Sequence, residues 1–257
     1  MCLTEKDCLK KYDIRIVIIS RSRANTIKSK TLKYFPDWIE VIVPESQKET
    51  YQKVISNPIL TTPDDIKGLG LLRNWVLDHL KEKTVVMVDD DITSVYSLTG
   101  PLTRRIEDPL EVVQLIINTT VMAQDLGVSC FGFSQLDIRK YKGTDPFILN
   151  TWVGCIIGII GRRYRFRQDK FKVDIDFCLK NLLVDRILFC DSRYYFAQNR
   201  DNNPGGNSEY RTEETMYESI NSLVDKWFPY VSSNKKKHRN NVSIKLNVAR
   251  RQSISYE

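Results

Sequence analysis

Three consecutive aspartates, Asp89, Asp90 and Asp91, directly follow the short apolar run 84–88 (TVVMV). Carboxylates crowded at the end of a buried strand repel one another unless a cation neutralises them. Mg²⁺ and Mn²⁺ prefer carboxylate oxygens and can share their coordination with substrate phosphates. Because successive side chains of an extended chain point to opposite sides, Asp89 and Asp91 can bind one metal together while Asp90 faces away. The alternative, a solvated acidic loop or a cap for the next helix, remains open.

The composition argues against several other chemistries. His79 and His238 are the only histidines, which makes a histidine-rich zinc site or a Ser-His-Asp hydrolase a poor explanation. The six cysteines form no Cys-x-x-Cys pair and are interpreted as buried free thiols of a reducing cytosol. No glycine-rich phosphate loop with a lysine and no Asp-x-Asp after the first strand is present, which weakens kinase-like and dehalogenase-like interpretations. A metal in this protein is therefore expected to be held by oxygen.

The elements that position the aspartates alternate between strands and helices. Predicted strands cover residues 13–20, 38–43, 84–88, 128–134, 152–160, 187–190 and 193–198. Predicted helices follow Gly68-Leu69-Gly70, open at Asp108-Pro109, open at residues 173–177, and run from Ser208 to Pro229. This order favours an α/β fold, a mostly parallel sheet flanked by helices in a single domain of residues 1–230. Its ligand site is expected at the carboxyl ends of the strands.

Residues 231–257 form a basic C-terminal segment. They hold seven lysines and arginines against one acid, Glu257, so nearly all of the net charge of +7 lies here. Residues 242–248 alternate apolar and polar side chains, which predicts a strand that packs on or extends the domain. Concentrated positive charge suits a polyanionic partner such as nucleic acid, and a solvated tail fits the pattern equally well.

Four motifs together resemble those of the GT-A glycosyltransferases over residues 13–200. In chain order they are Ser20-Arg21-Ser22, Gly68-Leu69-Gly70 with Arg73-Asn74, Val88-Asp89-Asp90-Asp91, and Asp174-Ile175-Asp176. The resemblance implies a Rossmann-related, GT-A-like fold and an enzyme that uses Mn²⁺ or Mg²⁺ and a nucleotide-sugar donor, here expected to be a UDP-sugar. It implies that Asp89 and Asp91 bind the metal. It also implies that the donor is bound by Ser20, Arg21, Arg73, Asp89 and Asp90.

Asp174-Ile175-Asp176 looks like the acidic acceptor-site motif of that family, with Val173 where a glutamate often stands. By this resemblance Asp174 is the base that takes the proton of the acceptor hydroxyl, a role worth typically ~10²–10⁴-fold in rate. Asp176 is the second candidate, and an inverting outcome is expected. A carboxylate at a helix start can also simply cap the backbone, and this alternative stays open.

A narrower resemblance concerns the acceptor. The compact length, the loop Asn203-Pro204-Gly205-Gly206-Asn207 and the basic C-terminal strand are similar to the phage TET-associated glycosyltransferases. This resemblance implies DNA as the acceptor, at the hydroxymethyl oxygen of a modified cytosine or uracil, with base flipping in a duplex. It adds Gly205 and Gly206 to the donor-binding residues. For a phage-encoded protein the site of action is the host cytoplasm.

Residues 162–172 interleave six basic side chains with three aromatic ones, a pattern typical of nucleic-acid contacts. An edge strand with Tyr164 and Phe166 turned inward fits equally well. The longest apolar stretch, 152–161, is half the roughly 20 residues that cross a bilayer, and the first residues do not resemble a secretory signal, so no transmembrane segment and a cytoplasmic protein are expected.

Two alternative functions remain open. One is transfer to a protein, lipid or surface glycan, with the basic tail on an anionic carrier or membrane face. The other is a catalytically silent nucleic-acid-binding protein on the same scaffold. The sequence does not indicate the sugar or the oligomeric state.

Overall fold

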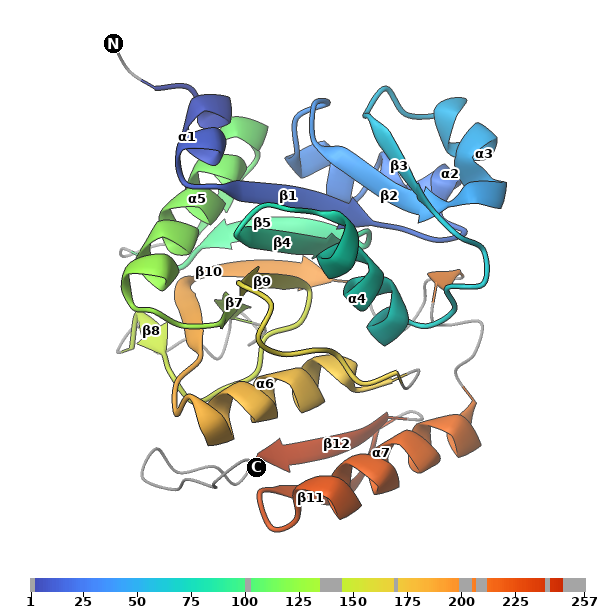
Figure 1. Ribbon diagram of the computed structural model, residues 1–257, viewed down its shortest axis with the longest axis vertical. Helices are drawn as coiled ribbons and strands as arrows, with labels where there is room; N and C mark the ends of the chain where they lie inside the picture. The colour runs from blue at the N-terminus through green and yellow to red at the C-terminus, as the bar shows by residue number, and fades with distance from the viewer. Residues whose placement is uncertain are drawn as a thin grey trace.

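A mixed sheet of ten strands runs through the computed structural model (Figure 1), which describes residues 3–99, 103–134, 145–168, 171–198, 205–206, 212–238 and 241–246. The strand order is β3-β2-β1-β4-β9-β7-β10-β5-β6, and β8 pairs with β10 beside this path. Helices cover both faces of the sheet, which confirms the predicted α/β fold class.

The N-terminal strands are parallel. β1 (Ile14–Ile19) lies between β2 (Glu40–Pro44) and β4 (Thr84–Asp89), and β3 (Ile59–Thr62) extends this row beyond β2. β1 and β4 are buried almost throughout, which explains why their Ile- and Val-rich runs do not alternate with polar residues. In the register Ile19 lies opposite Asp89, so the segments that follow β1 and β4 leave the sheet side by side.

The other strands make the sheet mixed. β9 (Ile156–Ile160) runs antiparallel between β4 and β7 (Cys130–Ser134). β10 (Phe189–Gln198) pairs in parallel with β7 and, beyond a register shift between Asp191 and Tyr195, antiparallel with β5 (Ile92–Ser97). The strands predicted at 187–190 and 193–198 are thus a single strand with an irregularity in its middle. The remaining members are β6 (Arg104–Ile106) and β8 (Phe147–Ile148).

Two apolar layers attach the helices to the sheet. On one face α5 (Pro109–Asp125) packs Val112 and Ile116 against a core that includes Ile18. On the other face α4 (Leu69–His79) and α6 (Val173–Val184) share a core with Val17 and Met87. The neighbours Val17 and Ile18 thus point to opposite faces, as the pleat of a strand requires.

The C-terminal elements pack outside α6. Leu223 and Trp227 of α7 (Glu213–Trp227) meet Ile175 and Leu179 of α6. α7 begins later than the predicted Ser208, because Thr212 provides its capping box. β11 (Val231–His238) and β12 (Asn241–Leu246) form a separate antiparallel pair next to α7 (Figure 1). The predicted C-terminal strand therefore pairs with β11 and does not join the main sheet, and the domain boundary at residue 230 stays a prediction.

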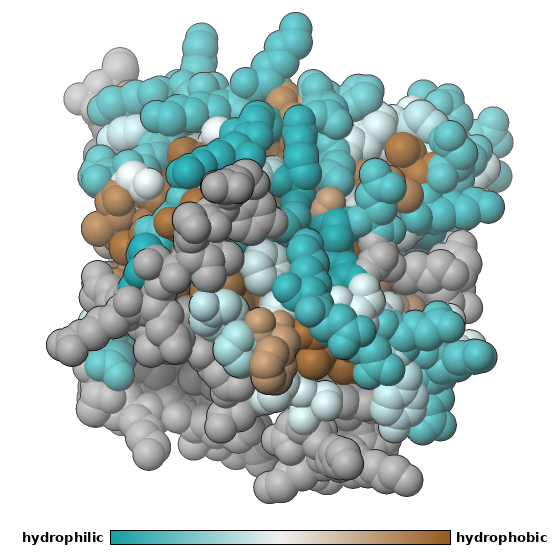
Figure 2. Space-filling view, turned by 60° about the horizontal axis from the view of Figure 1, so that its bottom comes forward, coloured by the Kyte–Doolittle hydropathy of each residue, from teal (hydrophilic) through white to brown (hydrophobic). Residues whose placement is uncertain are grey.

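Short helices occupy connections in the N-terminal half. They are α1 (Glu5–Lys11), α2 (Ala24–Ile27), η1 (Thr31–Tyr34), η2 (Glu45–Gln47) and α3 (Lys48–Gln52). On the face shown in Figure 2, hydrophilic side chains cover most of the described surface, with small apolar patches between them. Within the described ranges, no helix combines the length and apolar character needed to cross a bilayer.

Candidate active site

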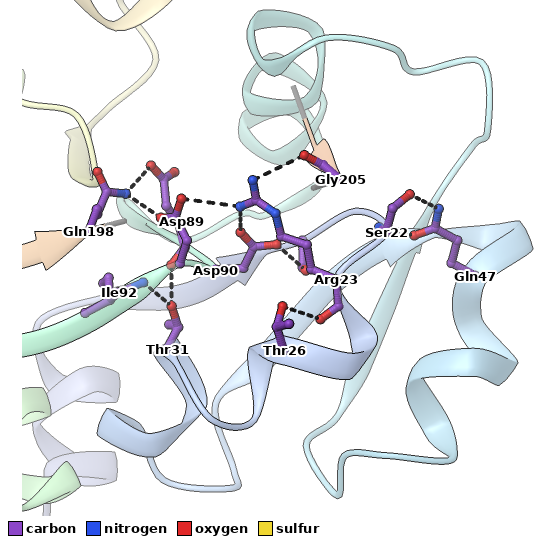
Figure 3. Close-up of polar contacts among 12 residues, drawn as sticks. Ser22, Arg23, Thr26, Thr31, Gln47, Asp89, Asp90, Ile92, Gln198 and Gly205 are labelled. Carbon is purple, nitrogen blue, oxygen red and sulfur yellow. Dashed lines mark hydrogen bonds and ion pairs between the residues drawn. The ribbon is translucent and has the colours of Figure 1, made fainter. Parts of the chain in front are cut away.

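The acidic run forms the turn between β4 and β5, and one buried threonine shapes that turn. The hydroxyl of Thr31 donates to the carbonyl of Asp89 (2.8 Å) and accepts from the backbone N–H of Ile92 (2.9 Å) (Figure 3). Thr31 is fully buried, so both ends of the turn are fixed from below. The three carboxylates are thereby presented at the carboxyl end of the parallel strands, where the ligand site was predicted.

Asp90 faces the loop that follows β1. Ser20 Oγ donates to Asp90 Oδ2 (2.5 Å) and shares a hydrogen bond with Tyr51 OH (2.7 Å). Burial raises the pKa of Asp90 and the pKa of Tyr51. Ser20 is 4% exposed, and its hydroxyl is occupied by Asp90 and Tyr51. Ser20 thus positions an aspartate in this structure, and its expected contact with the donor stays a prediction.

Arg23 closes the same side of the acidic run, and the sequence analysis missed it. Its Nη1 donates to Asp90 Oδ1 (2.5 Å) and lies 3.4 Å from Asp91 Oδ2, while its backbone N–H donates to Tyr51 OH (3.0 Å). Its side chain is 12% exposed. Burial opposes the positive charge, but the three carboxylates of the acidic run, Asp90 foremost, together outweigh it and raise the pKa of Arg23. The protein thus already supplies a cation to the acidic run.

Asp89 and Asp91 meet at a second residue that the sequence analysis missed. The side-chain amide of Gln198, the last residue of β10, donates to Asp89 Oδ2 (3.0 Å) and to Asp91 Oδ1 (2.7 Å). Figure 3 shows Gln198 beside Asp89 and Arg23 beside Asp90. One nitrogen atom therefore bridges the two carboxylates that are expected to bind the metal.

Arg73 supports Asp89 from inside the protein. It is 1% exposed, and its Nη2 lies 3.4 Å from Asp89 Oδ1 and donates to the carbonyl of Gly154 (3.2 Å). Its Nε and Nη1 have no hydrogen-bond partner among the described residues. α4 packs closely here because Gly70 has no side chain: a Cβ would lie 1.9 Å from the carbonyl oxygen of Arg167. Arg73 thus forms an ion pair with Asp89, and its expected contact with the donor diphosphate stays a prediction.

The two arginines leave the acidic run only partly neutralised. Burial raises the pKa of Asp89 to about 7 against the opposing charge of Arg73, and Asp91 adds to the rise. The Asp89 side chain is 27% exposed, so a cation from solution can reach it. A divalent cation there would favour the ionised carboxylate.

The described residues offer a metal two carboxylates and no closed cage. Among the described residues there is no group of three or more His, Cys, Asp or Glu side chains suited to hold a metal ion. Asp89 and Asp91 present oxygen ligands on a common side, next to Gln198. This donor set fits Mg²⁺ or Mn²⁺ whose other positions are taken by water and donor phosphates.

The described part of the glycine loop docks on the turn after β1. Gly205 O accepts from Arg23 Nη2 (3.2 Å), and the Gly206 N–H donates to the carbonyl of Arg21 (3.1 Å). Both glycines have left-handed φ values, 88° and 61°, and a Cβ on Gly205 would lie 2.6 Å from the carbonyl oxygen of Ser22. The backbone of Arg21 thus joins this loop to the edge of the site. Donor contacts of Arg21, Gly205 and Gly206 remain predictions.

The first turn of α6 separates the two candidate bases. Asp174 is half-buried and forms no hydrogen bond or ion pair with the described residues. Asp176 is fully buried and accepts from Lys226 Nζ (2.8 Å) and Trp227 Nε1 (2.8 Å). Burial raises the pKa of Asp176, but Lys226 and the neighbouring Lys180 outweigh it and lower that pKa. Asp176 thus joins α6 to α7 through buried contacts, and the choice of base between Asp174 and Asp176 stays a prediction.

The basic residues of segment 162–172 are largely engaged within the protein. Their partners are main-chain carbonyls near the end of α4 for Arg162, Asp185 for Arg163, Asp78 for Arg165 and Ser222 for Arg167. Phe166 and Phe171 are buried, and residues 164–167 form no strand. Neither the nucleic-acid interpretation nor the edge strand is supported here. The side chains of Lys235, Lys236 and Lys237, also predicted to bind DNA, lie outside the described residues.

Solved structures similar to this chain include the following three. Glucosyl-3-phosphoglycerate synthase from Mycobacterium tuberculosis matches with a TM-score of 0.51 and 12% identity, over 91% of this chain and 89% of that one. A 1–349 fragment of S. aureus TarS matches with a TM-score of 0.47 and 12% identity, over 82% of this chain and 66% of that one. The mannosyltransferase PcManGT from Pyrobaculum calidifontis matches with a TM-score of 0.47 and 10% identity, over 81% of this chain and 64% of that one. The chain thus spans just under two thirds of the length of the TarS fragment and of PcManGT. The match to the Mycobacterium tuberculosis synthase confirms the GT-A-like fold.

A comparison with curated proteins found no match. The family model of the TET-associated glycosyltransferases, in contrast, matches residues 14–206, from the first residue of β1 to the second glycine of the loop. That stretch includes the acidic turn, Arg23, Gln198 and the first turn of α6. Because the match covers well over half of the chain and contains the whole of this site, the chain belongs to the TET-associated glycosyltransferase family.

Proposed function

We propose that this protein is a glycosyltransferase that moves a sugar from a nucleotide-sugar donor to the hydroxyl of a hydroxymethylated pyrimidine in DNA. The observation that carries the proposal is the joining of Asp89 and Asp91 by the amide of Gln198. Two carboxylates side by side at a strand end suit a metal shared with a diphosphate. Membership of the TET-associated family supports a modified DNA base as the acceptor.

Asp89 and Asp91 would hold Mn²⁺ or Mg²⁺. When bound, the metal stabilises the negative charge that develops on the departing nucleoside diphosphate. Gln198 sets the spacing of these two carboxylates, and Arg73 fixes Asp89 from behind. Asp90 is turned toward Ser20 and Arg23, where we expect it to contact the sugar or ribose of the donor.

Asp174 takes the proton of the acceptor hydroxyl. Its carboxylate is unpaired among the described residues, whereas that of Asp176 is enclosed by cations. The hydroxyl oxygen attacks the anomeric carbon and forms the new glycosidic bond. The bond from that carbon to the diphosphate breaks, and its electron pair leaves with the nucleoside diphosphate. A single displacement of this kind inverts the anomeric configuration.

The donor assignment is supported by a protein of similar fold. The structure of the Mycobacterium tuberculosis synthase contains Mn²⁺ and UDP-glucose. We therefore expect a UDP-sugar and Mn²⁺ or Mg²⁺ for this chain.

The basic C-terminal segment supports DNA as the acceptor. It holds seven lysines and arginines, and its backbone forms the antiparallel pair β11 and β12. A two-stranded ribbon fits the major groove of DNA, and its cations can contact phosphates. A base in a duplex would have to be flipped out of the stack. Acting on DNA places the enzyme in the cytoplasm, that of the host if the protein is phage-encoded.

Mass spectrometry of nucleosides tests the proposal. Hydroxymethylated DNA is incubated with the protein, Mn²⁺ and a panel of nucleotide sugars, and a glycosylated nucleoside is expected with at least one donor. Asp89→Ala and Asp91→Ala should abolish transfer and metal-dependent donor binding, while Asp225→Ala, an exposed aspartate of α7, serves as the matched control. Transfer to glycan acceptors alone, or turnover of both variants at the parent rate, would contradict the proposal.

A further inference from the structure

Arg23 is a positive charge that is held in place within the acidic run. Its Nη1 contacts Asp90 and Asp91, and on its other side Nη2 donates to the carbonyl of Gly205 (3.2 Å) (Figure 3). A Cβ on Gly206 would lie 3.3 Å from Nη2, so the glycine loop packs closely against the guanidinium. The carboxylates and the loop thus enclose this cation from two sides.

Arg23 shares a carboxylate with the expected metal site. Its Nη1 lies 3.4 Å from Asp91 Oδ2, while Asp91 Oδ1 accepts from the amide of Gln198 that also reaches Asp89. A divalent cation on Asp91 would therefore lie near a charge of its own sign. An arginine within about 4–6 Å lowers the proton affinity of a carboxylate by about 10- to 1,000-fold. A metal ion that binds the same carboxylate meets the same opposing charge.

The charges of the site suit a metal ion that arrives with its diphosphate. Three carboxylates, Arg23 and Arg73 leave these five residues with at most a single net negative charge. A free divalent cation would make this largely buried set positive, which is costly away from water. A divalent cation on the diphosphate of a nucleotide sugar brings no net charge, because the two ionised phosphate oxygens balance it. The arginines thus oppose the free ion much more than its complex with the donor.

We propose that Arg23 makes the acidic run selective for a metal ion that is already bound to a diphosphate. Free Mn²⁺ or Mg²⁺ binds weakly, because Arg23 supplies the competing charge. The complex of the metal with the donor binds well, so the metal and the donor enter the site together. Arg23 is therefore a specificity-determining residue. The inference rests on the proposed function and concerns how its donor site is filled.

Binding of Mn²⁺ alone and of its complex with UDP tests this inference. Arg23→Gln removes the charge and should raise the affinity for free Mn²⁺, measured by electron paramagnetic resonance, by at least about tenfold. The affinity for the Mn²⁺–UDP complex, measured by calorimetric titration, should not rise, because this complex has no net positive charge. Arg23→Lys keeps the charge and should retain the weak binding of free Mn²⁺. Arg15→Gln, which removes a half-exposed arginine near the start of β1, is the matched control.

A double variant keeps the test valid if the loss of Arg23 weakens the fold. Arg23→Gln combined with Asp90→Asn removes both members of the buried ion pair, so neither charge is left without its partner. The net charge of the site then equals that of the parent, and the affinity for free Mn²⁺ should return to about the parent value. A disordered site would bind Mn²⁺ more weakly, so unfolding cannot produce the gain expected for Arg23→Gln.

The outcomes separate this inference from the proposed function. If the parent binds the Mn²⁺–UDP complex and folded Arg23→Gln binds free Mn²⁺ no more tightly than the parent, the inference is wrong and the proposed function stands. If Arg23→Gln tightens free Mn²⁺ and the complex equally, Arg23 does not discriminate between them and the inference is also wrong. If the parent binds neither Mn²⁺ nor its UDP complex, the metal site of the proposed function fails first and the inference fails with it.

Discussion

Arg23 and Asp90 form a buried ion pair, with Nη1 2.5 Å from Oδ1. Arg23→Ala leaves Asp90 without its cation in a site that is almost closed to solvent, so the metal-free protein should lose about 3–5 kcal/mol of unfolding free energy. Saturating Mn²⁺ should then raise the Tm of the variant more than that of the parent, because in the variant Mn²⁺ replaces the positive charge that Arg23 supplies to the acidic run. Arg15→Ala, which removes a half-exposed ion pair with Glu40, should cost at most about 1 kcal/mol. Equal Mn²⁺ shifts in parent and Arg23 variant would show that the metal does not bind there.

Gln198→Ala should weaken metal binding without unfolding the protein. The amide holds Asp89 and Asp91 at a common point, and loss of such an outer partner typically lowers metal affinity by about 10- to 100-fold. Calorimetric titration of Mn²⁺ in the presence of the nucleoside diphosphate measures the change. Gln114→Ala, which removes an amide contact to Asn118 on α5, is the control. An unchanged Mn²⁺ affinity would remove Gln198 from the site.

Asp174 and Asp176 should give opposite phenotypes although they are two residues apart. Asp174→Asn should lower kcat by ~10²–10⁴-fold with donor affinity within a few-fold of the parent and an unchanged Tm. Asp176→Ala should cost about 3–5 kcal/mol of stability, because it leaves Lys226 and Lys180 without their buried partner. Its folded fraction should retain turnover. Loss of donor binding in Asp174→Asn would instead assign this carboxylate to the metal site.

The stability of the metal-free protein should depend on Asp89 between about pH 4 and pH 7. Burial raises the pKa of Asp89 to about 7, whereas in the unfolded chain it is near ~3.9. The folded state therefore binds the proton more tightly, so this contribution favours folding at low pH and is lost as pH rises toward 7. Urea unfolding in chelator across this range should show the slope, and Asp89→Asn should make it shallower, with the remainder due to Asp90, whose pKa burial also raises. Mn²⁺ has to displace the proton of Asp89, so the affinity of the protein for Mn²⁺ should decrease as the pH is lowered below about 7. An identical pH profile in the Asn variant would contradict the assignment.

Neutralising the basic end should weaken DNA binding in a salt-dependent way. If Lys235, Lys236 and Lys237 contact phosphates, replacing all three with glutamine should reduce the slope of log K against log salt by about one for each lost contact. Sequence preference and donor binding should not change. Fluorescence anisotropy over a salt titration measures the slope, with glutamines at the exposed Lys28, Lys53 and Lys81 as the control. Equal slopes in both triple variants would identify the tail as solvated.

The acidic turn and the start of α6 could be predicted from the sequence because their signals are local. An unbroken apolar run followed by charged residues, such as β4, is most readily buried as a central strand of the sheet. β3 was missed because Pro58 and Pro63 flank it, and β11 because lysines occupy it, and both features are weak strand signals.

The supporting residues of the site could not be predicted in the same way. Arg23 meets Asp90 across 67 residues of chain, and local spacing does not show which loop cation turns toward which carboxylate. Asp176 matches the acidic motif as well as Asp174 does, and only the packing of α7 on α6 distinguishes them. Arg73 was selected for its charge, yet its side chain is almost fully buried behind Asp89, which local spacing does not reveal.

The bridge that Gln198 forms between Asp89 and Asp91 also sets the order in which the protein can mature. Its two hydrogen bonds span 109 and 107 residues. A ribosome adds about 5–20 residues per second, so on the order of 5–20 s separate the synthesis of the acidic turn from that of Gln198. During this interval the nascent chain has its carboxylates but not the amide that spaces them. The spacing of Asp89 and Asp91 that the proposed donor site needs is therefore fixed late in translation, once β10 has emerged and closed the sheet.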